Sequence, residues 1–328
     1  MGKQARISGT GFAVPPRILT NAEISQRVDT TDEWIRTRTG IEERRIASED
    51  MHNSDLAAEA SRKALCAAGI AAEEIDMIVV ATTTSDMPFP SMACILQQAL
   101  GARRAAVFDV VAACSGFVYA LSVARQYVAS GECRHVLVTA SEVLSRVTDW
   151  SDRSTCILFG DGAGAVVLSA SDEGASDILA FHLGGDGRLG DLLKIPAGGS
   201  SKPASHETVN AREHTIRMNG AEVFKAAVQK MNFCMRMVLR RAGLEASDLD
   251  LVIPHQANLR IIDSLRKYLD LPREKVYVNL QKYGNTSAAS IAIALAECVA
   301  SKRLARGNLL GMCAFGGGLT WGACVLRY

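Results

Sequence analysis

The sequence predicts an α/β protein built from two related halves. Short apolar runs alternate with stretches of helical spacing, one pattern of helix and strand recurs along the chain, and the composition suits a large core. Of the 328 residues, 48% are hydrophobic and 22% are charged. Such a chain is long for one domain, is not expected to be disordered, and can bury a substantial core.

The elements of the first half follow one another in the order expected of α/β architecture. Residues 57–68 and 116–129 have helical spacing and helix-forming composition, and Gly69 and Gly131 stand where helix C-caps are expected. Continuous apolar runs predict buried strands at residues 75–81, 136–138 and 164–168. Strands therefore alternate with helices through this half.

A similar pattern returns later in the chain. Residues 64–79 resemble residues 238–253 at an offset of 174, and residues 128–130 resemble residues 299–301 at an offset of 171. Echoes this short can arise by chance, but two in nearly the same register favour duplication over coincidence. Carried back along the predicted helix, the second offset makes the positions of Cys114 and Asn285 equivalent.

We therefore predict an N-terminal half at residues 1–172 and a C-terminal half at residues 173–328. Residues 171–217 differ from their surroundings because they are rich in Gly, Ser, Asp and Pro. We interpret them as the start of the second half and a long loop that could border a pocket.

Charge and cysteine content narrow the functional classes. Lys and Arg total 36 against 35 for Asp and Glu, so a net charge of +1 does not indicate nucleic-acid binding. The nine cysteines are scattered singly, without a Cys-x-x-Cys pair, and predict reduced thiols and no metal site. No apolar segment approaches the ~20 residues that span a bilayer, and residues 1–7 lack the apolar run of a secretory signal. We expect a cytoplasmic protein without membrane or nucleic-acid partners.

Cys114 is the strongest candidate for a nucleophile. It follows an apolar strand, lies among small residues and precedes Gly116, at the start of a predicted helix. The positive end of the helix dipole favours the thiolate, and a neighbouring backbone N–H can hold an oxyanion. A buried structural cysteine is the alternative, and this description fits most of the other eight.

Two polar residues occupy similar junctions. His255 follows the apolar run 251–253, at a strand end where open α/β sheets usually bind ligands, although a lone histidine is more often structural. Asn285 taken alone would be interpreted as a helix N-cap. Gly316–Gly318 could allow close backbone approach to a substrate or form only a tight turn. Together with Cys114, these residues suggest a thioester-handling site.

With these residues the chain resembles the 3-oxoacyl-(acyl-carrier-protein) synthase III family, the ketoacyl synthases that begin fatty-acid elongation. The resemblance runs from residue 7 to residue 322 and is specific, because its motifs are long and ordered. These motifs are residues 31–41 (TDEWIRTRTGI), 159–164 (FGDGAG), 254–260 (PHQANLR) and 284–290 (GNTSAAS).

The resemblance implies a thiolase-like fold with two duplicated halves, five alternating layers αβαβα and a homodimer. It implies Cys114 as nucleophile, with His255 and Asn285 as the decarboxylation site. Backbone N–H groups of Cys114 and Gly317 would form the oxyanion hole. The implied reaction is decarboxylative Claisen condensation of a short-chain acyl-CoA with malonyl-acyl carrier protein, without any metal or redox cofactor.

Binding residues are also implied by the resemblance. Those matched to CoA and its pantetheine arm are Trp34, Arg38, Arg153, Gly220, Ala257 and Asn258. Those matched to an acyl pocket are Thr83, Leu144, Phe159, Leu193, Ile216 and Phe315, with Phe89 reaching in from a partner subunit. Those matched to a basic face for the acidic carrier protein are Lys225, Arg260, Arg266 and Lys267. Charged residues on a helix are otherwise usually a solvated face.

Three alternatives remain open from the sequence. A secondary-metabolic condensing enzyme, or an acyltransferase without decarboxylation, could use the same scaffold. A thioester hydrolase would need a water path to acyl-Cys114. A non-catalytic subunit could bind acyl carrier protein, but it would need no activated thiol. His255 and Asn285 favour decarboxylation, and they do not identify the primer.

Overall fold

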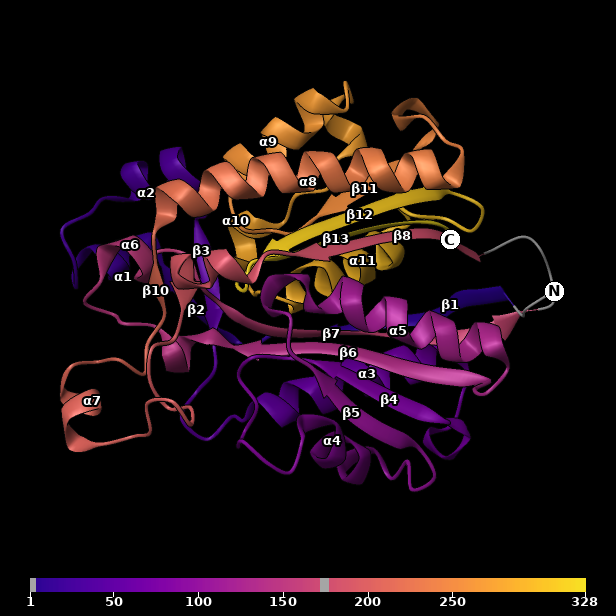
Figure 1. Ribbon diagram of the computed structural model, residues 1–328, viewed down its shortest axis with the longest axis horizontal. Coiled ribbons are helices and arrows are strands. Elements are labelled where there is room, and N and C mark those ends of the chain that lie inside the picture. The colour runs from indigo at the N-terminus through magenta and orange to yellow at the C-terminus, as the bar shows by residue number, and fades with distance from the viewer. Residues whose placement is uncertain (1–3, 172–176) are drawn as a thin grey trace.

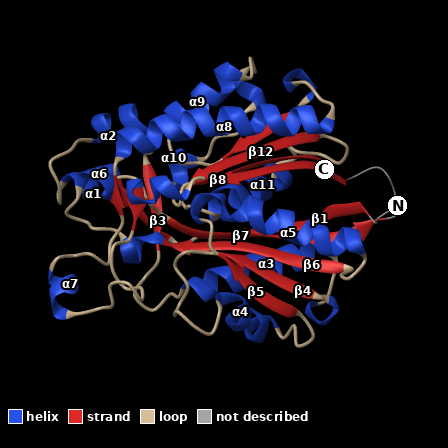
Figure 2. Cartoon of the chain, viewed as in Figure 1, coloured by secondary structure: helices blue, strands red, loops and turns tan. Residues whose placement is uncertain are grey.

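The computed structural model describes residues 4–171 and 177–328, and they form five alternating layers of helix and sheet (Figure 1). Two sheets are stacked with helices between them and on both outer faces, as the colours of Figure 2 make plain. This architecture confirms the predicted fold class. Within the described residues, no helix combines the length and the apolar character needed to cross a membrane.

The first sheet has five strands in the order β1-β7-β6-β4-β5. Strand β4 pairs in parallel with both β5 and β6, whereas β7 pairs antiparallel with β6 and β1. The strands are β1 (Gln4–Ala13), β4 (Met77–Ala81), β5 (Ala106–Val110), β6 (His135–Val143) and β7 (Asp161–Ser171). The three apolar runs that predicted strands thus lie in β4, β6 and β7, although β4 begins two residues later than predicted.

The second sheet repeats this pattern with four strands in the order β11-β12-β13-β8. Strands β11 and β12 are parallel, and β13 is antiparallel to both β12 and β8. The place of a fifth strand is taken by a single parallel bridge between Val252 and Val276. The strands are β8 (Asp177–Gly185), β11 (Leu251–Pro254), β12 (Leu309–Gly316) and β13 (Thr320–Arg327). The boundary predicted between residues 172 and 173 lies outside the described residues and stays a prediction.

The central layer contains two apolar helices, α5 (Gly116–Ser130) and α11 (Ala289–Ala300), which begin shortly after Cys114 and Asn285. Nine of the twelve residues of α11 are buried, as expected of a helix enclosed by two sheets. The approach to the first sheet is close, because a Cβ on Gly164 of β7 would lie 2.5 Å from the Cβ of Ala292. Glycine at this position allows the two layers to pack.

Amphipathic helices cover the outer faces. On the first sheet lie α3 (Asn53–Ala68) and α4 (Met92–Leu100), and on the second lie α8 (Gly220–Ala242) and α9 (Leu259–Tyr268). Gly69, Gly131 and Gly243 end α3, α5 and α8 with positive φ angles of 66°, 86° and 67°, which confirms the first two as predicted C-caps. The predicted helices 57–68 and 116–129 correspond to α3 and α5.

Shorter elements gather at one end of the layers (Figure 1), and residues of α2, α6, β9 and β10 among them line the cavities of the site. They are β2 (Arg17–Thr20), α1 (Asn21–Ser25), α2 (Asp32–Thr39), β3 (Glu43–Ile46), α6 (Arg153–Cys156), β9 (Leu193–Lys194), α7 (His206–Asn210), β10 (Arg217–Met218) and α10 (Leu280–Tyr283). The described part of the segment 171–217 contains the end of β7, β8, β9, α7 and the first residue of β10. Leu193 and Ile216 within it line a cavity, so the predicted pocket-bordering loop is confirmed.

Candidate active site

Cys114 lies in a tight turn between strand β5 and helix α5. Ala113, the residue before it, has a positive φ of 44°, which bends the backbone sharply at the thiol. Ser115 donates a hydrogen bond of 2.8 Å to the hydroxyl of Thr320, which in turn donates to the carbonyl of Ala112 at 3.0 Å. The nucleophile turn is thus tied to the start of β13 in the second sheet.

The Cys114 thiol is buried and protonated. Burial raises its pKa to about 12, and the nearby Glu142 carboxylate adds to the increase, whereas a hydrogen bond with Ser287 lowers it. The sequence analysis expected the helix dipole to favour the thiolate. That expectation was wrong for the resting site, because loss of hydration opposes any charge at this position. Attack by Cys114 therefore requires a proton acceptor.

His255 follows β11 and is held by two hydrogen bonds. Its backbone N–H donates to the carbonyl of Cys313 at 2.8 Å, and its Nδ1 lies 2.7 Å from the hydroxyl of Ser290. The same hydroxyl accepts a hydrogen bond of 3.3 Å from the N–H of Gln256. Burial lowers the pKa of His255 to about 3. The imidazole is therefore neutral at physiological pH, with Nδ1 engaged by Ser290.

Asn285 is positioned by the backbone of the first half. Its N–H donates to the carbonyl of Leu158 at 2.8 Å, and its carbonyl accepts from the N–H of Gly160 at 3.1 Å. The side-chain Oδ1 accepts a hydrogen bond of 2.8 Å from the N–H of Ser287. With the amide oxygen held in this way, the NH2 group is the part of the carboxamide available to a substrate.

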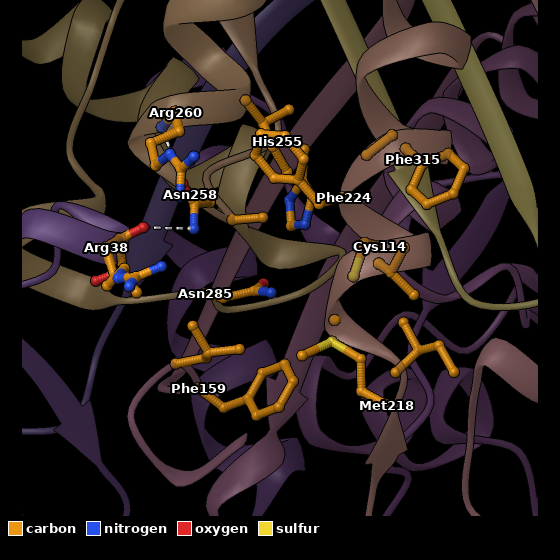
Figure 3. A pocket seen from close by; sticks show the side chains of 18 of the residues that line it. Arg38, Cys114, Phe159, Met218, Phe224, His255, Asn258, Arg260, Asn285 and Phe315 are labelled. Carbon is orange, nitrogen blue, oxygen red and sulfur yellow. Dashed lines mark hydrogen bonds between the residues drawn. The ribbon is translucent and has the colours of Figure 1, made fainter. Parts of the chain in front are cut away.

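Cys114, His255 and Asn285 converge on one cavity of about 540 Å³ (Figure 3). The structure therefore brings together three residues that the sequence separates by as much as 171 positions. The same cavity is lined by the predicted CoA and pantetheine residues Trp34, Arg38, Gly220, Ala257 and Asn258. The side-chain amide of Asn258 donates to the carbonyl of Arg38 at 3.1 Å, drawn as a dashed line in Figure 3.

The outer part of this cavity carries an aromatic ring close to two cations. The guanidinium carbons of Arg38 and Arg153 lie 5.6 and 5.2 Å from the centre of the Trp34 ring. Arg153 is held there by a hydrogen bond of 2.9 Å to the carbonyl of Asp29. A flat ring and a phosphate could bind here by stacking and by charge, provided that Arg153 moves off the indole.

A second cavity of about 370 Å³ reaches Cys114 from another direction. Its walls include five of the residues predicted for an acyl pocket: Thr83, Leu144, Phe159, Leu193 and Ile216. The sixth, Phe315, lines the larger cavity instead. Phe89, predicted to reach in from a partner subunit, lies at the surface with 84% of its area exposed.

The glycines after Phe315 bring the second sheet against the nucleophile. A Cβ on Gly316 would lie 2.6 Å from the backbone nitrogen of Cys114 and 3.1 Å from that of Ser115. The close approach at Gly316 is therefore to the protein's own backbone, and the predicted approach to a substrate stays a prediction. Gly317, the predicted second oxyanion donor, follows directly, close to the Cys114 turn, where a Cβ would lie 3.7 Å from that of Ala113.

The basic residues predicted to receive a carrier protein lie on α8 and α9. Lys225, Arg260 and Lys267 are exposed, and the Arg260 guanidinium carbon lies 5.3 Å from the centre of the Phe224 ring at the edge of the larger cavity. Arg266 differs, because it is partly buried and donates to the carbonyl of Leu271 at 3.0 Å. Three of the four cations therefore form an open basic face beside the cavity.

Sequence reasoning missed a buried carboxyl group beside the nucleophile. Glu142 of β6 is fully buried and accepts hydrogen bonds from Thr84 at 2.6 Å, from Ser287 at 3.0 Å and from the N–H of Thr83 at 3.1 Å. Burial raises its pKa, and these donors lower it. A lone glutamate within the apolar stretch 135–143 was the signal that could have identified it.

Comparison with known proteins agrees with this fold. Residues 108–187 match the family model described as 3-oxoacyl-(acyl-carrier-protein) synthase III, and residues 239–328 match that of its C-terminal region. A beta-ketoacyl-(acyl-carrier-protein) synthase III of Caldanaerobacter subterraneus subsp. tengcongensis is 53% identical over 99% of this chain and 98% of its own.

Solved structures give the same result. The 3-oxoacyl-(acyl-carrier-protein) synthase III of Aquifex aeolicus VF5 superposes with a TM-score of 0.91 and 49% identity over 99% of this chain and all of that one. The priming beta-ketosynthase of the R1128 polyketide pathway gives a TM-score of 0.92 at 39% identity, over 99% of this chain and 96% of that one.

The fold and the convergence of Cys114, His255 and Asn285 define a thiolase-like condensing enzyme, an acyltransferase. Within that class of enzymes, the comparisons identify one family. The chain belongs to the 3-oxoacyl-(acyl-carrier-protein) synthase III family, which confirms the resemblance found in the sequence.

Proposed function

We propose that this enzyme joins a short-chain acyl-CoA to malonyl-acyl carrier protein by decarboxylative Claisen condensation. The products are 3-oxoacyl-acyl carrier protein, CoA and carbon dioxide, and the reaction initiates type II fatty-acid synthesis. The observation that carries the proposal is the convergence of one thiol, one neutral imidazole and one carboxamide on a single cavity. Family membership supports the same activity.

The first half-reaction is transfer of the acyl group to Cys114. The thiol sulfur attacks the thioester carbonyl, and the backbone N–H groups of Cys114 and Gly317 stabilise the oxyanion. CoA then leaves, and the acyl chain remains as a thioester in the 370 Å³ cavity, beside Thr83, Leu144 and Ile216. A covalent intermediate of this kind predicts ping-pong kinetics.

The second half-reaction is decarboxylation of the malonyl group. Its thioester carbonyl would accept hydrogen bonds from Nε2–H of His255 and from the NH2 group of Asn285. Both groups suit this role, because Ser290 occupies Nδ1 of the imidazole and Ser287 occupies Oδ1 of the amide. The enolate formed as carbon dioxide departs attacks acyl-Cys114 and releases the 3-oxoacyl product. No step requires a metal or redox cofactor.

The lining of the larger cavity and the cations beside Trp34 support the following binding roles. Trp34 and Arg153 would hold the adenine of CoA, Arg38 its phosphates, and Gly220, Ala257 and Asn258 the pantetheine arm. The basic face formed by Lys225, Arg260 and Lys267 would receive the acidic carrier protein, with Arg266 contributing less. Complementary charge of this kind mainly speeds association.

The proposal also includes a homodimer in the cytoplasm. Phe89, Val111 and Met87 expose 84%, 77% and 44% of their area, and Val111 lines the acyl cavity as well. A second chain covering this apolar face would bury these side chains and bring its own Phe89 to the cavity. All nine cysteines are free, which is typical of a reducing compartment.

One observation favours a second candidate. The priming beta-ketosynthase of a polyketide pathway superposes as well as the fatty-acid enzymes do. A secondary-metabolic condensing enzyme would use the same half-reactions with a different primer or acceptor, so the two candidates differ only in substrate preference.

The test is a condensation assay with purified protein, a panel of acyl-CoA primers and malonyl-acyl carrier protein. We expect one carbon dioxide and one CoA for each 3-oxoacyl-carrier product, and no product with Cys114→Ala. Preference for a primer absent from fatty-acid synthesis would favour the second candidate. Release of free acid instead of condensation product would show a thioester hydrolase.

A further inference from the structure

Glu142 is a buried titratable group beside the nucleophile that the proposed reaction leaves unused. Its carboxylate accepts hydrogen bonds from the hydroxyls of Thr83 and Thr84 and from that of Ser287. Among the described residues, no cation lies within ion-pairing distance of it. Burying a carboxylate without a cationic partner costs free energy, so the presence of Glu142 at this position needs an explanation.

Ser287 stands between this carboxylate and the nucleophile. Its hydroxyl donates to Oε1 of Glu142 at 3.0 Å and also forms a hydrogen bond with Cys114. Cys114, Ser287 and Thr83 line the same cavity. A hydroxyl has one proton to donate and lone pairs that accept. While Ser287 donates to Glu142, it can therefore accept the thiol proton of Cys114.

The other candidate base is unsuitable. The hydroxyl of Ser290 lies 2.7 Å from Nδ1 of His255, so this ring nitrogen is already engaged and is not free to take the thiol proton. The imidazole is also a very weak base, because burial lowers its pKa to about 3. The elements packed around Glu142 offer hydroxyls and one backbone amide, with Cys114 as the titratable neighbour. Asp161 on the adjacent β7 is bound to Ser145 and to the N–H of Ala47 instead.

We propose that Glu142 takes up the proton of Cys114 during acylation and that the Ser287 hydroxyl carries it between them. This proposal rests on the proposed function, in which Cys114 is the nucleophile. Ser287 touches the reacting sulfur, and Glu142 acts through Ser287.

The step balances in atoms and charge. As the Sγ–carbon bond forms, the S–H bond breaks, Ser287 takes the thiol proton, and Ser287 gives its own proton to Glu142. The electron pair of the thioester carbonyl moves to oxygen, and collapse of this intermediate expels CoA thiolate. The proton then returns through Ser287 to the CoA sulfur. One buried negative charge is transferred rather than created, which avoids the cost of ionising a second buried group.

The experiment is single-turnover acylation followed by intact mass at pH 6 to 9.5, with wild type and Glu142→Gln. We expect the variant to acylate about 100-fold more slowly at pH 7, the range typical of general base catalysis. The difference should shrink as pH rises, because the variant must use thiolate formed without the relay. Decarboxylation of malonyl-carrier protein alone should change by less than about threefold, since His255 and Asn285 perform it.

Three further variants keep the test decisive. Ser287→Gly removes the hydroxyl and tolerates the φ of 48° at this position, and it should slow acylation as Glu142→Gln does. The double variant should be no slower than either single one, because both remove the same path. Asp161→Asn, which neutralises the neighbouring buried carboxyl, should acylate at nearly the wild-type rate.

The outcomes separate the two proposals. Normal acylation by Glu142→Gln or Ser287→Gly would overturn the relay, as would equal loss of both half-reactions or an equally slow Asp161→Asn. Absence of any acyl group on wild-type Cys114 would instead overturn the proposed function.

Discussion

Asn285 pairs with Phe159 in a parallel β-bridge that joins the two halves of the molecule. The bridge is made by backbone hydrogen bonds of 2.8 and 3.1 Å to Leu158 and Gly160, so the side chain takes no part in it. The carboxamide can therefore be altered while its position is kept. This separation allows the decarboxylation site to be tested without disturbing the nucleophile.

Asn285→Asp should impair decarboxylation selectively. The new carboxylate can still accept from the N–H of Ser287, but it places an oxygen where the developing enolate needs a donor. Loss of one oxyanion donor typically costs about 10² to 10³ in rate. Carbon dioxide release from malonyl-carrier protein measures the effect, and Cys114 acylation should stay within about threefold of wild type. A parallel fall in both rates would contradict this assignment.

Decarboxylation should show no titration of His255 near neutral pH. Burial lowers its pKa from 6.5 to about 3, so the imidazole stays neutral from pH 5.5 to 7.5 by this account. Between about pH 3 and 6.5 the unfolded chain binds a proton here that the folded chain does not, so stability rises with pH across that window. The largest slope from one group is about 1.4 kcal/mol per pH unit.

Urea unfolding at several pH values measures this linkage. His255→Gln should lose less stability on acidification than wild type, because it removes the titrating group. An identical pH dependence, or a decarboxylation profile with a midpoint near pH 6.5, would show that His255 titrates normally.

Gly316→Ala should distort the nucleophile turn. Its Cβ would lie 2.6 Å from the backbone nitrogen of Cys114, so the turn or β12 must shift. Overpacking of this kind typically costs about 1–3 kcal/mol, and we expect both lower stability and slower acylation. Gly187→Ala is the matched control, because a Cβ there has no neighbour within 4 Å. If the two variants had the same stability and the same acylation rate, the close approach at Gly316 would not be important for function.

Trp34→Ala should weaken binding of acyl-CoA without changing the chemistry at Cys114. The indole lies beneath Arg38 and Arg153 at the outer end of the cavity. Removing a base-stacking ring typically costs 1–3 kcal/mol, so KM for acyl-CoA should rise by about tenfold. Acyl-pantetheine, which lacks the nucleotide, is the control substrate and should react equally with both proteins. An equal loss with both substrates would place Trp34 in the fold rather than in the nucleotide site.

Local pattern predicted α/β architecture with two related halves and singled out the three polar junction residues, whereas the family resemblance supplied the thiolase-like fold and the residues' roles. Cys114, His255 and Asn285 each follow or precede a recognisable element, and the apolar runs of β4, β6 and β7 are visible in the chain. Other features depend on distant contacts. Glu142 is bound by residues 59 and 145 positions away, and no local pattern brings these partners together.

The charge state of the site also could not be predicted from the sequence. The position of Cys114 before a helix suggested a thiolate, but burial by both halves dominates and holds the thiol protonated. The same burial keeps His255 neutral. Burial depends on how the layers pack and cannot be inferred from the sequence. The effect of the helix dipole can be inferred from the sequence, but the desolvation caused by burial outweighed it.

The most direct test is the intact mass of the protein after incubation with a panel of acyl-CoAs, followed by peptide mapping. The account predicts one acyl group on each chain, located on Cys114, with the preferred primers ranked by their rates. Addition of malonyl-acyl carrier protein should remove this group as a 3-oxoacyl product. No adduct with any acyl-CoA, or a Cys114 adduct that malonyl-carrier protein leaves in place, would contradict the central claim.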